Sequence, residues 1–203
     1  MKKANECVLY LVRHGQTEWN VKRLIQGHMD IPLNGKGRKQ VSALAKKLED
    51  IQFHAVYSSD LSRTSETAEL IAKQHHREVI TTTALRERYF GKFQGRSFGK
   101  NKNILKLIND LKKSTVDENE IENDEKVMKR FVGYLRQISR ENIGETILVV
   151  THAGPMRTFL ITIGWGSYEN LTEGCIDNLA FVKLASDGKN FTVEETSGIA
   201  KLT

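Results

Sequence analysis

The sequence VLYLVRHG, residues 8–15, starts with five continuous apolar residues and stops abruptly at Arg13 and His14. A short apolar run of β-prone residues is typical of a strand that is buried on both faces, as in a parallel sheet. We therefore predict a central strand over residues 8–12, with two titratable side chains at its carboxyl end.

The same arrangement recurs much later in the chain, where the strand-like run TILVVT, residues 146–151, leads directly into His152. Gly154 permits a tight turn there, and Pro155 suits the first turn of a helix that extends to about residue 163. A strand that ends in a histidine and a glycine and then enters a helical segment therefore occurs twice.

Strand-like and helical patterns alternate around these two stretches. Apolar positions three and four residues apart predict amphipathic helices, and Ser58, Ser59 and Asp60 are N-cap candidates for one of them. The expected helices cover residues 37–50, 61–74, 102–113 and 125–140, and the further expected strands cover 55–57, 79–81 and a closing hairpin of 181–185 and 191–195. This alternation predicts an α/β fold: a three-layer sandwich with a mostly parallel sheet, helices on both faces and an antiparallel edge strand.

Length and composition fit one domain. The chain has 203 residues, of which 39% are hydrophobic, and it contains no internal repeat or clear boundary. We therefore expect residues 1–203 to form a single domain, with 91–125 as a lid-like insertion. The acidic run DENEIENDE, residues 117–125, is expected to be a mobile loop.

Composition also excludes several classes of protein. No apolar run approaches the roughly 18 residues that span a bilayer, so no membrane association is expected. The net charge is +6, but the basic residues lack the interleaved aromatic residues of a base-stacking surface, so no nucleic-acid partner is expected. Cys7 and Cys175 are the only cysteines and nothing resembles an export signal, which predicts a cytoplasmic location.

Polar side chains follow several of the expected strands, at the edge of the sheet where the functional crevice of such folds lies. These residues are Arg13 and His14 after the first strand, Arg63 after the second, Glu87 after the third and His152 after the strand 146–151. Guanidinium groups bind phosphate oxygens through paired N–H donors, and helix N-termini add backbone donors. The convergence predicts a site for a phosphoryl group.

Each of these residues also has a simpler explanation. A single His-Gly pair after a strand is most often a loop feature, and Glu87 between Arg86 and Arg88 is typical of a surface ion pair. Two histidines and a carboxylate could instead bind a metal ion. Because Arg13 and Arg63 would repel a divalent cation, the phosphoryl site is favoured over the metal site.

Several longer segments carry a resemblance to a known family. They are LVRHGQTEWN (11–20), QGHMDIPLNG (26–35), YSSDLSRTSETA (57–68), LRER with GKFQG (85–88 and 91–95) and VVTHAG (149–154). In this order they resemble the motifs of the histidine phosphatase superfamily. That group contains cofactor-dependent phosphoglycerate mutases, fructose-2,6-bisphosphatases, α-ribazole phosphatases and broad-specificity phosphatases.

The resemblance implies a role for each residue of the predicted site. His14 would be the nucleophile that forms a phosphohistidine, with its other ring nitrogen donating to a backbone carbonyl. Glu87 would be the general acid, and its carboxylate would later activate water. The expected ligands of the phosphoryl oxygens are Arg13, Arg63 and His152, with Asn20, the backbone near Gln26 and Gly27, and the N–H of Ala153 as further donors. This cycle requires no cofactor and no metal.

The resemblance favours a phosphatase over a mutase. Phosphoglycerate mutases usually carry a longer insertion with an adjacent arginine pair and a proline-rich stretch, and residues 91–125 contain neither. The expected function is hydrolysis of phosphate monoesters of small metabolites, and the alternative is a cofactor-dependent phosphoglycerate mutase. A further interpretation is a protein-binding module that docks through 117–125, although such a module could dispense with His14, Glu87 and His152.

Overall fold

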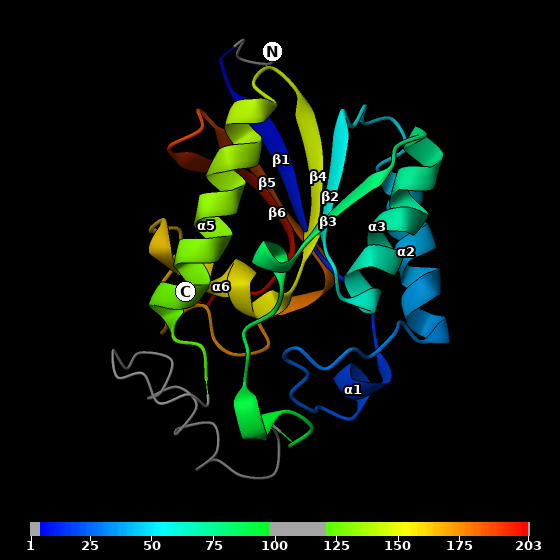
Figure 1. Ribbon diagram of the computed structural model, residues 1–203, viewed down its shortest axis with the longest axis vertical. Helices are drawn as coiled ribbons and strands as arrows, with labels where there is room; N and C mark the ends of the chain where they lie inside the picture. Colours follow the sequence, from blue (N-terminus) through cyan, green and yellow to red (C-terminus); the bar gives the residue numbers. More distant parts are fainter. Residues whose placement is uncertain (1–4, 98–120, 203) are drawn as a thin grey trace.

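The computed structural model describes residues 5–97 and 121–202, and it contains a six-stranded mixed sheet (Figure 1). The strands are β1 (Cys7–Arg13), β2 (Ala55–Ser59), β3 (Val79–Thr82), β4 (Thr146–Thr151), β5 (Ile176–Ser186) and β6 (Phe191–Ile199). Their order is β3-β2-β4-β1-β5-β6. The first four strands pair in parallel, and β5 and β6 add an antiparallel edge, which confirms the expected fold class.

Two pairs of helices cover the two faces of the sheet. One face carries α2 (Gly35–Lys47) and α3 (Ser62–Ala72), and the other carries α5 (Asp124–Glu141) and α6 (Ala153–Thr162) (Figure 1). The shorter elements are α1 (Glu18–Val21) and the 3₁₀ turns Lys73–His75, Thr83–Leu85 and Gly91–Phe93. Within residues 5–97 and 121–202, none of the helices has the length and apolar character that crossing a membrane needs.

Strand β1 explains why its sequence is continuously apolar. Leu9 and Leu11 belong to the core that packs against α5 and α6, whereas Tyr10 and Val12 belong to the core against α2 and α3. Helices cover both faces of the sheet at β1, so side chains on neither face point to solvent and the strand can be apolar throughout. β1 pairs in parallel with β4 up to its last residue, Arg13. The residues that follow these two strands therefore emerge next to each other.

The expected N-cap of the helix after β2 was wrong. The N-cap residue is Leu61, which makes no side-chain capping hydrogen bond. Asp60 pairs instead with Arg86, at 2.6 Å from Oδ2 to Nη2, and Ser59 Oγ lies 3.0 Å from His152 Nε2. Polar side chains that looked available for local capping are thus used by partners distant in sequence.

Strand β5 begins at Ile176 rather than at 181 as expected. Its first residues did not resemble a strand in the sequence because Asp177 and Asn178 are polar. In the structure, Leu179 interrupts the regular strand with a left-handed conformation, at a φ of 60°. The pairing of β5 with β6 shifts register between Ile176 and Phe181. This irregular start carries polar residues to the carboxyl edge of the parallel strands.

The described end of the acidic run, residues 121–125, is irregular as far as Asn123 and then enters α5, one residue earlier than the expected start of that helix. Asn123 caps α5 by accepting a hydrogen bond from the N–H of Lys126, and Asp124 is the first residue of the helix. Glu122 pairs with Arg130. Residues 117–120, the expected helix 102–113 and most of the expected insertion 91–125 lie outside the described residues.

Candidate active site

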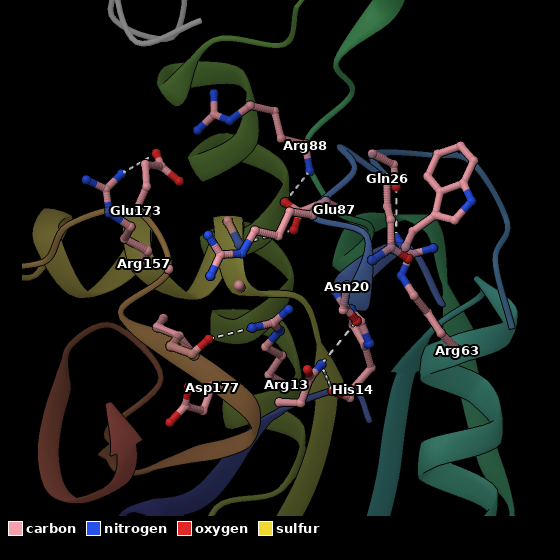
Figure 2. A pocket seen from close by; sticks show the side chains of 18 of the residues that line it. Arg13, His14, Asn20, Gln26, Arg63, Glu87, Arg88, Arg157, Glu173 and Asp177 are labelled. Carbon is pink, nitrogen blue, oxygen red and sulfur yellow. Dashed lines mark hydrogen bonds and ion pairs between the residues drawn. The ribbon is translucent and has the colours of Figure 1, made fainter. Parts of the chain in front are cut away.

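A cavity of about 690 Å³ lies at the carboxyl edge of the parallel strands (Figure 2). Among the residues that line it are eight that the sequence predicted: Arg13, His14, Asn20, Gln26, Gly27, Arg63, Glu87 and Ala153. His152 stands directly behind them, fully buried, with its ring centroid 5.2 Å from that of His14. We call Arg13, His14, Arg63 and His152 the basic cluster.

His14 is held in one orientation by the turn after β1. Its Nδ1 lies 2.7 Å from the carbonyl oxygen of Gly15, and only 3% of the residue is exposed. Since a carbonyl can only accept, Nδ1 carries the proton and Nε2 keeps its lone pair. Burial and the positive charges of Arg63 and Arg13 hold the pKa of His14 well below its usual range. His14 is therefore neutral at physiological pH, with Nε2 unprotonated.

The turn itself is fixed by close packing around Gly15. The N–H of Gly15 donates to Thr67 Oγ1 on α3, at 3.1 Å. A side chain at Gly15 would lie about 3.0 Å from Val41 and 3.1 Å from the carbonyl of Gly37 on α2. A glycine here lets α2 and α3 approach the turn and hold the imidazole in place.

Arg13, which is partly buried, and Arg63, which is fully buried, are cations without carboxylate partners in the part of the chain that the structure describes. Arg13 donates to the carbonyl of Ile176 at 2.5 Å, and Arg63 donates to the carbonyls of Met29 and Gly27 at 2.9 and 2.8 Å. Burial lowers the pKa of both guanidinium groups, to about 10 for Arg63. Two desolvated positive charges beside a neutral histidine form a strong local site for an anion.

Several buried polar atoms of this region have no hydrogen-bond partner in the described protein. These atoms are Arg13 Nε, Arg63 Nε, His152 Nδ1 and Gln26 Oε1. Burial and the neighbouring Arg63 also lower the pKa of His152 well below its usual range. Buried polar groups are normally paired, so their concentration in one place is a feature of a binding site.

Glu87 lies across the pocket from His14 and Arg13 (Figure 2). Its Oε1 accepts from the N–H of Arg88 at 2.7 Å, and its Oε2 accepts from the N–H of Gly154 at 3.1 Å, at the first turn of α6. A side chain on Gly154 would meet Oε1 at 2.2 Å. The lack of a side chain at Gly154 therefore leaves room for the Glu87 carboxylate.

The other predicted residues are arranged less simply. Asn20 Oδ1 accepts from Thr17 in a capping box and from Asn178 Nδ2, at 3.3 Å. The backbone carbonyl of Gly27 accepts from Arg63 Nη2 at 2.8 Å, so Gly27 orients Arg63. Gln26 and Ala153 line the cavity.

One wall of the pocket was missed by the sequence analysis. It consists of Arg157, Thr158, Glu173, Asp177 and Asn178. Arg157 could have been found, because it follows Ala153 by four residues and so shares its helix face. The irregular start of β5 gave no such signal, although Asn178 donates to the carbonyl of His14 at 3.1 Å. Arg157 and Glu173 pair at 3.1 Å, away from His14 (Figure 2).

The described residues contain no cluster of three or more His, Cys, Asp or Glu side chains that could hold a metal ion. The comparison with protein families supplies the remaining observation: the model of the histidine phosphatase superfamily (branch 1) matches residues 9–197. The chain belongs to this superfamily. The resemblance found in the sequence is thereby confirmed over nearly the whole chain.

Two curated relatives and one solved structure illustrate the similarity. The chain is 38% identical over 156 residues to phosphoglycerate mutase-like protein 4 of Arabidopsis thaliana, covering 74% of this chain and 68% of that protein. It is 36% identical over 161 residues to a metal-independent phosphoserine phosphatase of the same plant, covering 76% and 68%. A phosphoglycerate mutase structure from Bacillus anthracis superimposes with a TM-score of 0.81 at 27% identity, covering 97% and 94%.

The superfamily and the phosphatase-named relative together confirm the expected enzyme class, a phosphoric monoester hydrolase of the histidine phosphatase type. The pocket at the carboxyl edge of the parallel strands brings together eight of the nine predicted site residues.

Proposed function

We propose that this enzyme hydrolyses phosphate monoesters of small metabolites through a phosphohistidine at His14, without a metal or other cofactor. The observation that carries the proposal is the arrangement around His14. A neutral imidazole with one nitrogen bound to the carbonyl of Gly15 stands beside two unpaired arginines and faces the Glu87 carboxyl group. Nucleophile, anion site and proton source are thus within one cavity.

In the first half-reaction, His14 Nε2 attacks phosphorus and the bond from phosphorus to the ester oxygen breaks. Protonated Glu87 gives its proton to the departing oxygen, which leaves as an alcohol. In the second half-reaction, the Glu87 carboxylate takes a proton from a water molecule while the oxygen of that water attacks phosphorus. The phosphorus–nitrogen bond breaks, inorganic phosphate leaves, and Glu87 is protonated again.

Arg13, Arg63 and His152 would bind the phosphoryl oxygens during both steps. Their value is electrostatic, because donors fixed in a buried site need little reorganisation when charge develops in the transition state. Donors at the start of α6, including the N–H of Ala153, and the Asn20 side chain would complete the set. Gln26 and Gly27 help to shape this end of the pocket, and Gly27 also orients Arg63 through its carbonyl.

Substrate class is tested by a panel of phosphorylated metabolites with phosphate release as the readout. The cavity of about 690 Å³ suits a small metabolite. The same enzyme should be given 3-phosphoglycerate with 2,3-bisphosphoglycerate, because several relatives and a solved structure carry mutase names. We expect hydrolysis to be faster than isomerisation at equal enzyme concentration. Faster isomerisation would make the mutase the correct function.

Metal independence is tested with the same assay. Activity should survive exhaustive EDTA treatment and should be blocked by vanadate, an oxyanion that competes for the phosphoryl site. A strict requirement for added Mg²⁺ or Zn²⁺ would contradict the proposal. A cytoplasmic location belongs to the proposal as well, supported by the low cysteine content of the sequence, which has only Cys7 and Cys175.

A further inference from the structure

The loop that carries Glu87 is held from behind by one side chain of α5. Arg130 donates from Nη1 to the carbonyls of Ala84 at 2.9 Å and Arg86 at 2.7 Å, and from Nη2 to the carbonyl of Glu87 at 3.0 Å. These contacts join residues more than 40 positions apart in sequence. One guanidinium group thus holds the backbone of this loop at three residues: Ala84, Arg86 and Glu87.

The remaining N–H groups of Arg130 bind Glu122. Nε lies 2.7 Å from Oε1 and Nη2 lies 2.8 Å from Oε2. Glu122 also holds Tyr89, two residues after Glu87. The N–H of Glu122 donates to the carbonyl of Tyr89 at 2.9 Å, and its carboxylate accepts from the N–H of Tyr89 at 3.3 Å. Burial alone would raise the pKa of Glu122, but the hydrogen bonds and charge of Arg130 give a net lowering, so Glu122 is ionised.

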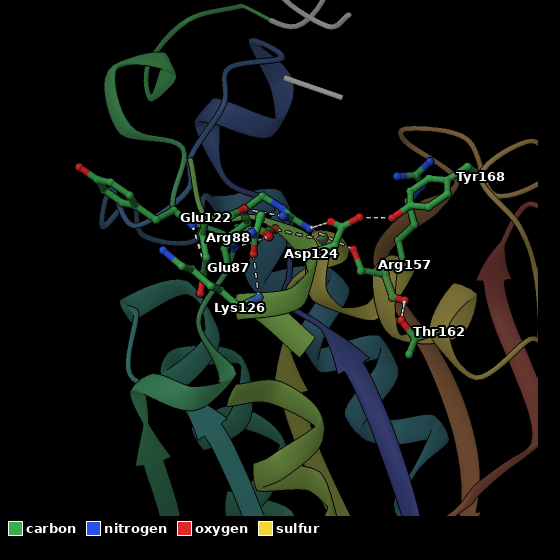
Figure 3. A network of polar contacts seen from close by, with 12 residues as sticks. Glu87, Arg88, Glu122, Asp124, Lys126, Arg157, Thr162 and Tyr168 are labelled. Carbon is green, nitrogen blue, oxygen red and sulfur yellow. Dashed lines mark hydrogen bonds and ion pairs between the residues drawn. The ribbon is translucent and has the colours of Figure 1, made fainter. Parts of the chain in front are cut away.

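Arg88 continues the attachment on the other side of Glu87. It donates to the carbonyl of Glu122, to Asp124 and, at 3.2 Å, to Thr158 Oγ1 on α6. Asp124 in turn accepts from the hydroxyl of Tyr168 (Figure 3). We call Arg88, Glu122, Asp124, Arg130 and Tyr168 the paired network.

We propose that Arg130, oriented by Glu122, is a positioning residue for Glu87. It touches neither the cavity nor the nucleophile; it sets the backbone from which the Glu87 carboxyl group reaches the N–H of Gly154. The proposal rests on the role of Glu87 as general acid. Proton transfer requires hydrogen-bond geometry, and a displacement of about 1 Å can cost about 10²-fold in rate.

Arginine is the residue type that this position requires. Its guanidinium has five N–H donors in a rigid fork, and all five are used, three on carbonyls and two on the Glu122 carboxylate. Lysine keeps the charge but offers three donors from one atom and no fork. Arg130→Lys therefore preserves the electrostatics of the region while releasing part of the loop.

The test measures phosphoenzyme formation in a single turnover with phosphoserine, an alkyl phosphate, and with p-nitrophenyl phosphate. An alkoxide needs a proton as it leaves, whereas nitrophenolate is a stable anion. Arg130→Lys should slow the phosphoserine reaction by about 10- to 100-fold and the p-nitrophenyl reaction by less than about 3-fold. The apparent dissociation constant of each substrate should stay unchanged.

Two further variants give the matched comparisons. Arg140→Met removes an arginine of the same helix that donates to the carbonyl of Gly188, at the other end of the molecule, and should leave both rates unchanged. Glu122→Gln keeps Arg130 and its three carbonyl bonds while weakening the contact that orients it. It should show the same contrast between substrates at about 3- to 10-fold, even if Arg130→Lys fails to fold.

Combination with Glu87→Gln separates a positioning role from a structural one. If Arg130 acts through Glu87, Arg130→Lys adds no further loss once Glu87→Gln is present. Equal losses for both substrates, or losses that add in the double variant, would overturn the positioning role while Glu87 remains the acid. If Glu87→Gln itself shows no contrast between substrates, the acid role of Glu87 fails, and the positioning proposal fails with it.

Discussion

Two kinds of arginine lie in and directly behind the pocket. In the basic cluster, Arg13 and Arg63 are bound to backbone carbonyls, and burial lowers their pKa values because no carboxylate of the described residues pairs with them. In the paired network, Arg88 is buried and Arg130 is partly buried, and they have Asp124 and Glu122 as partners. The first kind keeps its charge available for an incoming anion, and the second uses its charge to hold the frame.

This difference follows from the cost of burying charge. A buried pair satisfies itself, so removing one partner leaves an isolated charge and destabilises the fold. An unpaired buried cation is unfavourable in the free enzyme and becomes favourable only when an anion binds. Substitutions in the basic cluster should therefore reduce activity with little loss of stability. Substitutions that break a pair of the paired network should reduce stability, in addition to the effect on proton transfer proposed for Arg130 and Glu122.

The largest effect is expected for Arg13→Met. It removes a cation from the proposed phosphoryl site and, within the described residues, one hydrogen bond, to the carbonyl of Ile176. We expect kcat/KM to fall by about 10³-fold or more, as for other arginines that face a transferring phosphoryl group. The free energy of unfolding should change by no more than about 1 kcal/mol. Steady-state kinetics and urea denaturation on one preparation test both parts; retained activity with a large loss of stability would contradict the comparison.

The converse change is Asp124→Asn. It leaves Arg88, which is 1% exposed, without its charged partner, and it weakens the contact with Tyr168. The free energy of unfolding should fall by about 3 kcal/mol, measured by urea denaturation. Its control is Glu66→Gln, which breaks the exposed pair with Arg38 and should leave the midpoint nearly unchanged. Equal effects of the two substitutions would remove the distinction between paired network and ordinary surface pairs.

A smaller effect is expected from pH on the free energy of unfolding, through the two histidines of the basic cluster. Burial holds the pKa values of His14 and His152 well below 6.5, whereas the unfolded chain protonates them near 6.5. The unfolded state therefore binds more protons as pH falls below about 6.5, and stability declines. Each histidine contributes up to about 1.4 kcal/mol per pH unit in that window.

Denaturation curves between pH 7.5 and 5.5 test this expectation. His14→Gln should have a shallower dependence on pH than the parent enzyme, while His54→Gln, which changes an exposed histidine, should follow the parent. A parent enzyme whose stability is constant over this range would show that the cluster is not buried and neutral as described.

The sequence predicted the basic cluster because each of its members is placed by a local rule. Arg13 and His14 end one strand, His152 ends another, and Arg63 opens a helix, so strand and helix limits were sufficient to bring them together. The sheet was predictable for the same reason, since its central strands are continuously apolar. The sheet and the basic cluster could be predicted once the direction of each strand was known, because the direction decides at which edge of the sheet the strand ends.

The paired network depends on partners that local patterns do not reveal. Arg130 lies on the polar side of an amphipathic helix, where sequence reasoning expects a solvated charge. Asn178 and its neighbours begin a strand that a left-handed residue and a register shift make irregular. Both cases require knowing which distant segment packs alongside, and that is set by the tertiary fold.

The most direct test of the proposed mechanism is the chemical state of His14 during turnover. Enzyme quenched in the first turnover with a ³²P-labelled substrate should carry a phosphate that is labile in acid and stable in base. Peptide mapping should locate it on His14, and His14→Ala should form none. Phosphate on any other residue, or full turnover by His14→Ala, would contradict the account.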